Sequence, residues 1–150
     1  MDVLAYTFRT NPFRSALEEQ FGSAFVFGKM REDLERFKAE FTARPRALIV
    51  GFAKSWDASS YIEAKALNRF SGNRVLETGG PAQLDLALPQ KVEPPFKVNR
   101  RGSDSFCNWA MYRIGSFIAN QPEKVEHMFY HCHEEDIDAV ARILTTMRSS

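Results

Sequence analysis

Two side chains able to perform nucleophilic chemistry stand near each other in the second half of the chain. Cys107 lies where a polar turn leads into an amphipathic pattern typical of a helix, and His131 ends an apolar run further along. A thiol at a helix N-terminus lies near unpaired N–H groups and the positive end of the helix dipole, so we expect a lowered pKa. A nearby imidazole can serve as its base. The pair therefore predicts a thiol enzyme.

Two short motifs surround these residues, SFCNWAMY around Cys107 and FYH ending at His131. They resemble the nucleophile segment and the histidine strand of pyroglutamyl peptidase type I, a family of cytosolic cysteine exopeptidases. EAKALN, from Glu63 to Asn68, resembles the stretch that supplies the catalytic glutamate. The resemblance implies a triad of Cys107, His131 and Glu63. Such a triad removes an N-terminal pyroglutamyl group from small peptides or amides through a thioester, without a cofactor.

The same resemblance implies further site residues. An arginine in the loop after the glutamate segment supports the oxyanion in the family; Arg74 lies at a similar distance, with Arg69 as the alternative. Asn11, in an Asn-Pro pair, resembles the residue that follows the family's first strand. Phe8 and Phe13 are the candidates for the apolar pocket that holds the lactam ring. Backbone N–H groups at the start of the Cys107 helix are additional oxyanion donors.

One departure from the family keeps a second function open. The turn at 8–12 is much shorter than the family's loop after the first strand, which helps to form the lactam pocket. The alternative function is therefore a non-catalytic binding or assembly protein that retains the peptidase fold.

A zinc site is a third alternative, because His127, His131 and His133 would share one face of a continuous strand. However, the acidic run beginning at Glu134 indicates a helix start, so we expect the strand to end first and divide the three. We therefore expect no metal site. Cys132 should point away from His131 and pack in the core.

Strands alternate with helices along the chain. We expect strands near 3–8, 24–27, 47–52, 62–67, 96–99 and 125–131, and helices near 13–20, 30–41, 106–118 and 137–147. The segment 73–95 is expected to be a loop with at most one short element at 84–88. This order predicts a single domain, 1–150, with a three-layer α/β/α fold and a mostly parallel sheet. Sites in such folds form at the carboxyl ends of strands.

Composition restricts the partners. The 150 residues carry 20 Lys+Arg and 19 Asp+Glu, for a net charge of +1, which gives no indication of nucleic-acid or membrane binding. The amino terminus lacks the features of an export signal, so we expect a cytoplasmic protein with free thiols. Leu84, Leu86 and Leu88 in the long loop could form a homo-oligomer contact.

Overall fold

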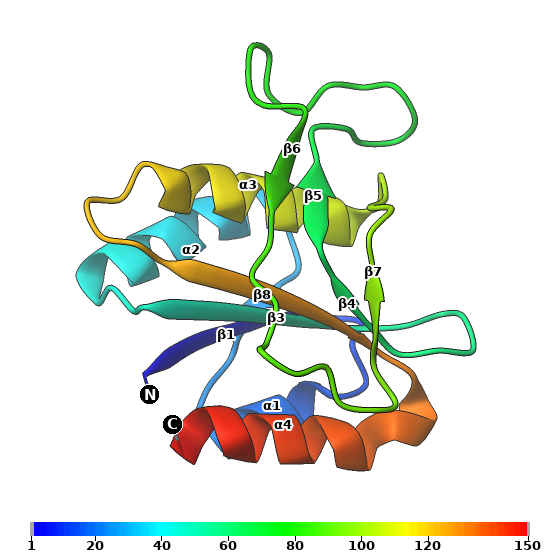
Figure 1. The fold of residues 1–150 in the computed structure, drawn as a ribbon. Coiled ribbons are helices and arrows are strands. Elements are labelled where there is room, and N and C mark those ends of the chain that lie inside the picture. Colours follow the sequence, from blue (N-terminus) through cyan, green and yellow to red (C-terminus); the bar gives the residue numbers. More distant parts are fainter. Residues whose placement is uncertain (1, 150) are drawn as a thin grey trace.

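The apolar strands and amphipathic helices of the sequence form three layers in the computed structural model, which describes residues 2–149 (Figure 1). The helices are α1 (Arg14–Phe21), α2 (Met30–Ala43), α3 (Phe106–Ala119) and α4 (Ile137–Ser149), the last preceded by a short 3-10 turn, η1 (Glu134–Asp136). The strands are β1 (Val3–Phe8), β2 (Phe25–Phe27), β3 (Leu48–Lys54), β4 (Tyr61–Glu63), β5 (Lys65–Leu67), β6 (Gln83–Asp85), β7 (Lys97–Asn99) and β8 (Glu126–Cys132).

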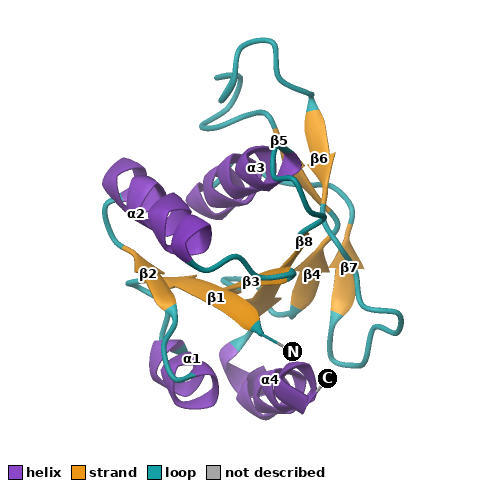
Figure 2. Cartoon of the chain, turned by 90° about the vertical axis from the view of Figure 1, so that its left-hand side faces the viewer, coloured by secondary structure: helices purple, strands orange, loops and turns teal. Residues whose placement is uncertain are grey.

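The main sheet has the strand order β2-β1-β3-β8-β4-β7. The first four strands are parallel to one another, whereas β4 runs antiparallel to β8 and parallel to β7. Helices α2 and α3 cover one face, and α1 and α4 cover the other (Figure 2). The predicted three-layer α/β/α architecture with a mostly parallel sheet is confirmed.

Alternate residues of the central strands supply two separate cores. Tyr6 and Phe129 pack toward α2 and α3, whereas Phe52 and Cys132 pack toward α1 and α4. This alternation is the pattern expected of strands buried on both faces. Gly51 lies between the rings of Tyr6 and Phe129, and a Cβ there would overlap both rings. Cys132 is fully buried in the second core, on the strand face opposite His131.

The expected single strand at 62–67 is wrong, because the chain changes sheets at Ala64. The Ala64 N–H donates to the carbonyl of Asn99 in β7 (2.9 Å), whereas the Ala64 carbonyl accepts from the N–H of Leu86 (2.9 Å). One residue thus serves both sheets, which divides the run into β4 and β5. Strand β5 pairs antiparallel with β6 as a hairpin that stands beside α3 (Figure 1).

Asn108 attaches this hairpin to α3. Its Oδ1 accepts from the N–H of Leu67 (2.8 Å), and its Nδ2 donates to the carbonyls of Leu67 (3.0 Å) and Arg69 (2.8 Å). The side chain is fully buried. Because Asn108 directly follows Cys107, this clamp also fixes the first turn of α3 against the strand that continues from Glu63.

Two expectations about exposed and buried apolar residues are corrected. Phe106 falls on the apolar side of the helix expected at 106–118, which predicts that it is buried, but it is 61% exposed, because it opens the first turn of α3 at the edge of the core. Leu84, Leu86 and Leu88 were expected to be exposed, but Leu86 is buried and the other two pack against the cores of their own chain. A homo-oligomer contact at this segment stays a prediction, to which the half-buried Leu84 and Leu88 can contribute. No helix within residues 2–149 is long and apolar enough to cross a membrane.

Candidate active site

A cavity of about 690 Å³ lies at the carboxyl ends of the four parallel strands. The last residues of β1, β2 and β3 line it, together with His131 near the end of β8. Cys107 reaches the cavity from the first turn of α3, and Glu63 reaches it from β4. The three side chains of the expected triad, which come from distant segments, therefore line one cavity.

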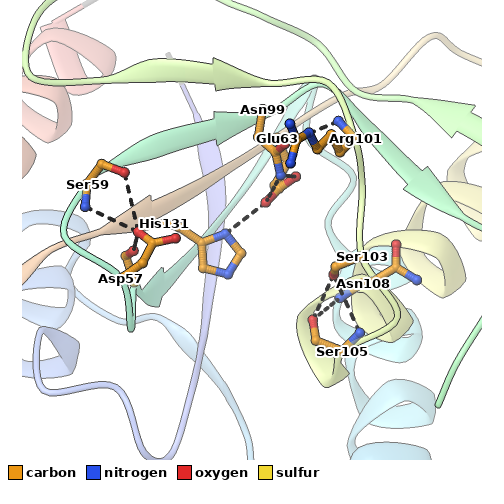
Figure 3. Close-up of polar contacts among 10 residues, drawn as sticks. Asp57, Ser59, Glu63, Asn99, Arg101, Ser103, Ser105, Asn108 and His131 are labelled. Carbon is orange, nitrogen blue, oxygen red and sulfur yellow. Dashed lines mark hydrogen bonds and ion pairs between the residues drawn. The ribbon is translucent and has the colours of Figure 1, made fainter. Parts of the chain in front are cut away.

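Glu63 and His131 are in contact. The Nδ1 atom of His131 lies 3.1 Å from Oε1 of Glu63 (Figure 3). Tyr61 pairs directly with His131 between β4 and β8, and Glu63, two residues further on, projects from the same face. The two atoms lie at ion-pair distance, but Nδ1 does not form a hydrogen bond with the carboxylate. This geometry leaves Nε2 as the nitrogen that can exchange a proton with a thiol.

A second carboxylate lines the cavity but has other partners. Asp57 accepts hydrogen bonds from the hydroxyl of Ser55 (3.0 Å) and from the backbone N–H of Ser59 (3.2 Å). The Ser59 N–H, followed by the Ser55 hydroxyl, holds the pKa of Asp57 below its usual value. Asp57 therefore stabilises the β3–β4 loop, and Glu63 is the acid in contact with His131.

The environment of Cys107 corrects the expected direction of its pKa. Burial, followed by the nearby charge of Glu63, raises the pKa of the thiol from 9.0 to about 12, although a hydrogen bond from the residue's own backbone N–H acts in the opposite direction. Ser105 caps the helix, accepting from the N–H of Asn108 (3.3 Å). Desolvation thus outweighs the helix terminus, and the resting residue is a thiol that needs a base during the reaction.

The first turn places the two candidate phenylalanines on opposite sides of the sheet. Phe8 lines the cavity, but Phe13 is buried with Leu17 in the core under α1 and α4. Strand β1 ends on one face, and the chain then crosses to start α1 on the other. Asn11 also lines the cavity, although its side chain holds the turn, donating to Thr7 Oγ1 (2.7 Å) and accepting from the N–H of Phe13 (3.0 Å).

Neither candidate arginine lines the cavity. Arg74 is exposed in the turn after β5, where its carbonyl accepts from the N–H of Phe70 (2.8 Å). Arg69 is also exposed, and its carbonyl accepts from Asn108. Of the oxyanion donors expected at the start of α3, the N–H of Asn108 already donates to Ser105, which leaves the N–H groups of Phe106 and Cys107 as the candidates.

The three histidines separate. His127 is buried, and its Nε2 lies 2.8 Å from the hydroxyl of Tyr6. His133 follows the end of β8, and its Nδ1 accepts from the N–H of Glu135 (3.3 Å). Over residues 2–149, no group of three His, Cys, Asp or Glu side chains is placed to hold a metal ion.

Two residues of the site were missed from the sequence. Asn99 donates from Nδ2 to Oε1 (3.2 Å) and Oε2 (3.0 Å) of Glu63. Tyr61 lies with its ring centroid 4.9 Å from that of His131. Sequence signals existed for both. Tyr61 is two positions before Glu63 and so shares its strand face, and Asn99 ends an expected strand.

Comparison with known proteins reveals the same architecture in solved peptidase structures. Pyroglutamyl peptidase I from Bacillus amyloliquefaciens matches with a TM-score of 0.80 and 17% identity, covering 95% of this chain and 92% of that one. A mutant pyrrolidone carboxyl peptidase from Pyrococcus furiosus matches with a TM-score of 0.71 and 16% identity, covering 95% and 86%. No protein-family model and no curated protein matches the sequence. The structural matches confirm the pyroglutamyl-peptidase-like fold implied by the motifs.

Proposed function

We propose that this protein is a cysteine peptidase or amidase in which Cys107 is the nucleophile, His131 the general base and Glu63 the orienting acid. Its first candidate reaction is the removal of an N-terminal pyroglutamyl group from a small peptide. The observation that carries the proposal is the 3.1 Å contact between Glu63 and His131 in the same cavity as Cys107. The fold, similar to that of pyroglutamyl peptidase I, supports the same function.

The proposed reaction begins with proton transfer from the Cys107 thiol to Nε2 of His131. The sulfur then attacks the carbonyl carbon of the scissile amide, and the resulting oxyanion accepts hydrogen bonds from N–H groups at the start of α3. The imidazolium gives its proton to the leaving amine as the C–N bond breaks, leaving a thioester. Water, deprotonated by His131, hydrolyses the thioester and regenerates the thiol. Glu63 stabilises the imidazolium in both halves of the reaction.

The raised thiol pKa determines how this mechanism starts. A thiol with a pKa of about 12 is neutral at physiological pH, so the nucleophile must be formed in the proton-transfer step. The acid–imidazole contact is therefore required in the first step and in thioester hydrolysis. A protein with an inert buried thiol would instead fit the alternative function, a non-catalytic binding or assembly protein.

The cavity is suited to a small, mostly apolar acyl group. Phe8, Phe27 and Phe106 line it, and the first two are the inner phenylalanines because they are buried, whereas Phe106 is exposed. Trp56, which is 84% exposed, also borders the cavity, and its ring is held 4.6 Å from Nζ of Lys54. A lactam ring could pack on the inner phenylalanines, while the leaving peptide passes the exposed aromatic rings.

A fluorogenic pyroglutamyl amide tests the proposal. The wild-type protein is expected to release the fluorophore, and Cys107→Ser is expected to abolish release. Cys132→Ala is the matched control, because Cys132 is a buried cysteine outside the cavity. Release that survives Cys107→Ser would contradict the proposed nucleophile. No release by a folded wild-type protein would favour the binding or assembly function.

A further inference from the structure

Glu63 has a neutral partner that determines where its carboxylate points. We propose that Asn99 is a positioning residue for the reaction, holding Glu63 in the orientation that supports His131. The inference rests on the proposed triad, but it concerns a residue to which the motifs give no role. It predicts that Asn99 influences Cys107 through Glu63 and His131, without touching the thiol or the substrate.

The contact geometry fixes the orientation of the Asn99 amide. Its Oδ1 accepts from the backbone N–H of Arg101 (3.1 Å), which only the oxygen end of the amide can do. The nitrogen end must then face Glu63, where Nδ2 lies 3.2 Å from Oε1 and 3.0 Å from Oε2 (Figure 3). Both carboxylate oxygens are therefore held by one side chain that is itself held by the backbone.

The neutrality of Asn99 suits this role. Glu63 is only 2% exposed, and within residues 2–149 no lysine or arginine forms an ion pair with it. A buried carboxylate needs hydrogen-bond donors to offset its lost hydration. A cation in place of Asn99 would satisfy the carboxylate but would compete with the imidazolium for its charge. An amide supplies the donors and leaves the negative charge for His131.

The strand register connects Asn99 to the other parts of the site. Asn99 pairs with Glu63 between β7 and β4, and its carbonyl accepts from the N–H of Ala64 (2.9 Å). The chain continues from Asn99 through a short turn into α3, which carries Cys107. The residue that holds the acid is therefore also the last strand residue before the nucleophile helix.

The alkylation rate of Cys107 by iodoacetamide at neutral pH tests this role without a peptidase substrate. All variants carry Cys132→Ala, so that Cys107 is the one thiol whose alkylation is measured. Asn99→Leu is expected to slow alkylation about tenfold, the order expected for a lost hydrogen bond to a charged group. Glu63→Gln is expected to slow it as well, because the lost stabilisation of the His131 imidazolium should outweigh the lower thiol pKa that follows from removing the Glu63 charge. Since Asn99 acts through Glu63, the double variant should be no slower than Glu63→Gln alone. Additive losses would overturn the inference.

Two further variants keep the test decisive. Asn99→Ser retains a hydroxyl donor and is expected to recover part of the rate; it also serves if Asn99→Leu does not fold. Asn68→Leu is the control, because the Asn68 side chain also makes two hydrogen bonds outside the cavity, donating to the backbone carbonyl of Glu77 (2.8 Å) and accepting from its backbone N–H (2.8 Å). It should change the melting temperature but not the alkylation rate. If Asn68→Leu slows alkylation as much as Asn99→Leu does, the effect of Asn99 is on stability alone and the positioning role is overturned.

His131→Gln separates this inference from the proposed function. If His131→Gln leaves alkylation unchanged, the imidazole does not activate the thiol and the triad itself is contradicted. If His131→Gln slows alkylation but folded Asn99→Leu does not, the triad stands and the role of Asn99 is overturned. If alkylation slows in both variants but the wild type releases no fluorophore from the pyroglutamyl amide, the positioning role of Asn99 is supported and the proposed substrate is contradicted.

Discussion

The ring of Tyr61 lies against the imidazole of His131, with centroids 4.9 Å apart and planes tilted by 32°. The two residues are direct partners between β4 and β8, and the ring of Phe129 flanks the imidazole as well, at 5.0 Å. The imidazole is thus restrained by aromatic rings, and its Nδ1 faces Glu63. These ring contacts hold the imidazole beside the carboxylate of Glu63.

Tyr61→Ala should remove part of this restraint. We expect kcat for the proposed reaction to fall about tenfold, because a freely turning imidazole spends less time aligned with both Glu63 and the thiol. Tyr61→Phe keeps the aromatic ring, so its kcat should fall much less. Steady-state kinetics on the pyroglutamyl amide measure the difference. Equal losses in the two variants would assign the effect to the hydroxyl and contradict restraint by the ring.

The raised pKa of Cys107 makes a prediction about its reactivity with pH. Burial disfavours the thiolate in the folded protein, so in the Cys132→Ala background the alkylation rate should still be rising above pH 9. Free cysteine under the same conditions should approach a plateau near its own pKa. A rate for Cys107 that is already constant at neutral pH would reveal a preformed thiolate, as a helix N-terminus alone would produce.

Asn108 should contribute strongly to stability, because it joins α3 to β5. Asn108→Leu removes three hydrogen bonds and leaves the backbone groups of Leu67 and Arg69 without those partners. We expect the free energy of unfolding, measured in urea, to fall by about 2–4 kcal/mol. Asn120→Leu is a control on the same helix, where an exposed amide makes one bond to the carbonyl of Ser116 (3.1 Å). Its effect should stay below about 1 kcal/mol.

The order of elements could be predicted from the sequence because it depends on local patterns. The apolar run of β3 and the periodicity of α2 are visible in single segments. The division at Ala64 is different, because it depends on which distant strands accept the hydrogen bonds of one residue. The burial of Leu86 likewise depends on where the β5–β6 hairpin packs, which no local pattern contains.

For the site, the resemblance implied a triad of Cys107, Glu63 and His131, and these three side chains line one cavity. The prediction that Phe13 lines the pocket is wrong, because the chain crosses the sheet between β1 and α1. The prediction that the pKa of Cys107 is lowered is wrong as well, because the burial that raises it is a property of the assembled fold. Asn99 was missed because its contact with Glu63 follows from strand register rather than from any spacing along the chain.

His127 gives the protein a specific sensitivity to acid. The imidazole is buried against Tyr6, and burial lowers the pKa of His127 from 6.5 to about 3. The unfolded chain therefore binds a proton below about pH 6.5 that the folded protein does not bind, so stability falls as the pH falls from about 6.5 toward 3.

Replacing both partners should remove this sensitivity. In Tyr6→Phe/His127→Leu, neither a titrating ring nor an unpaired hydroxyl remains. The loss of unfolding free energy between about pH 7 and pH 4.5 should then be smaller than in the wild type by about 2 kcal/mol. Urea unfolding at the two pH values measures it, and comparing each protein with itself cancels the packing cost of the substitutions. An unchanged loss would mean that other groups cause the acid sensitivity and that His127 is accessible to protons in the folded state.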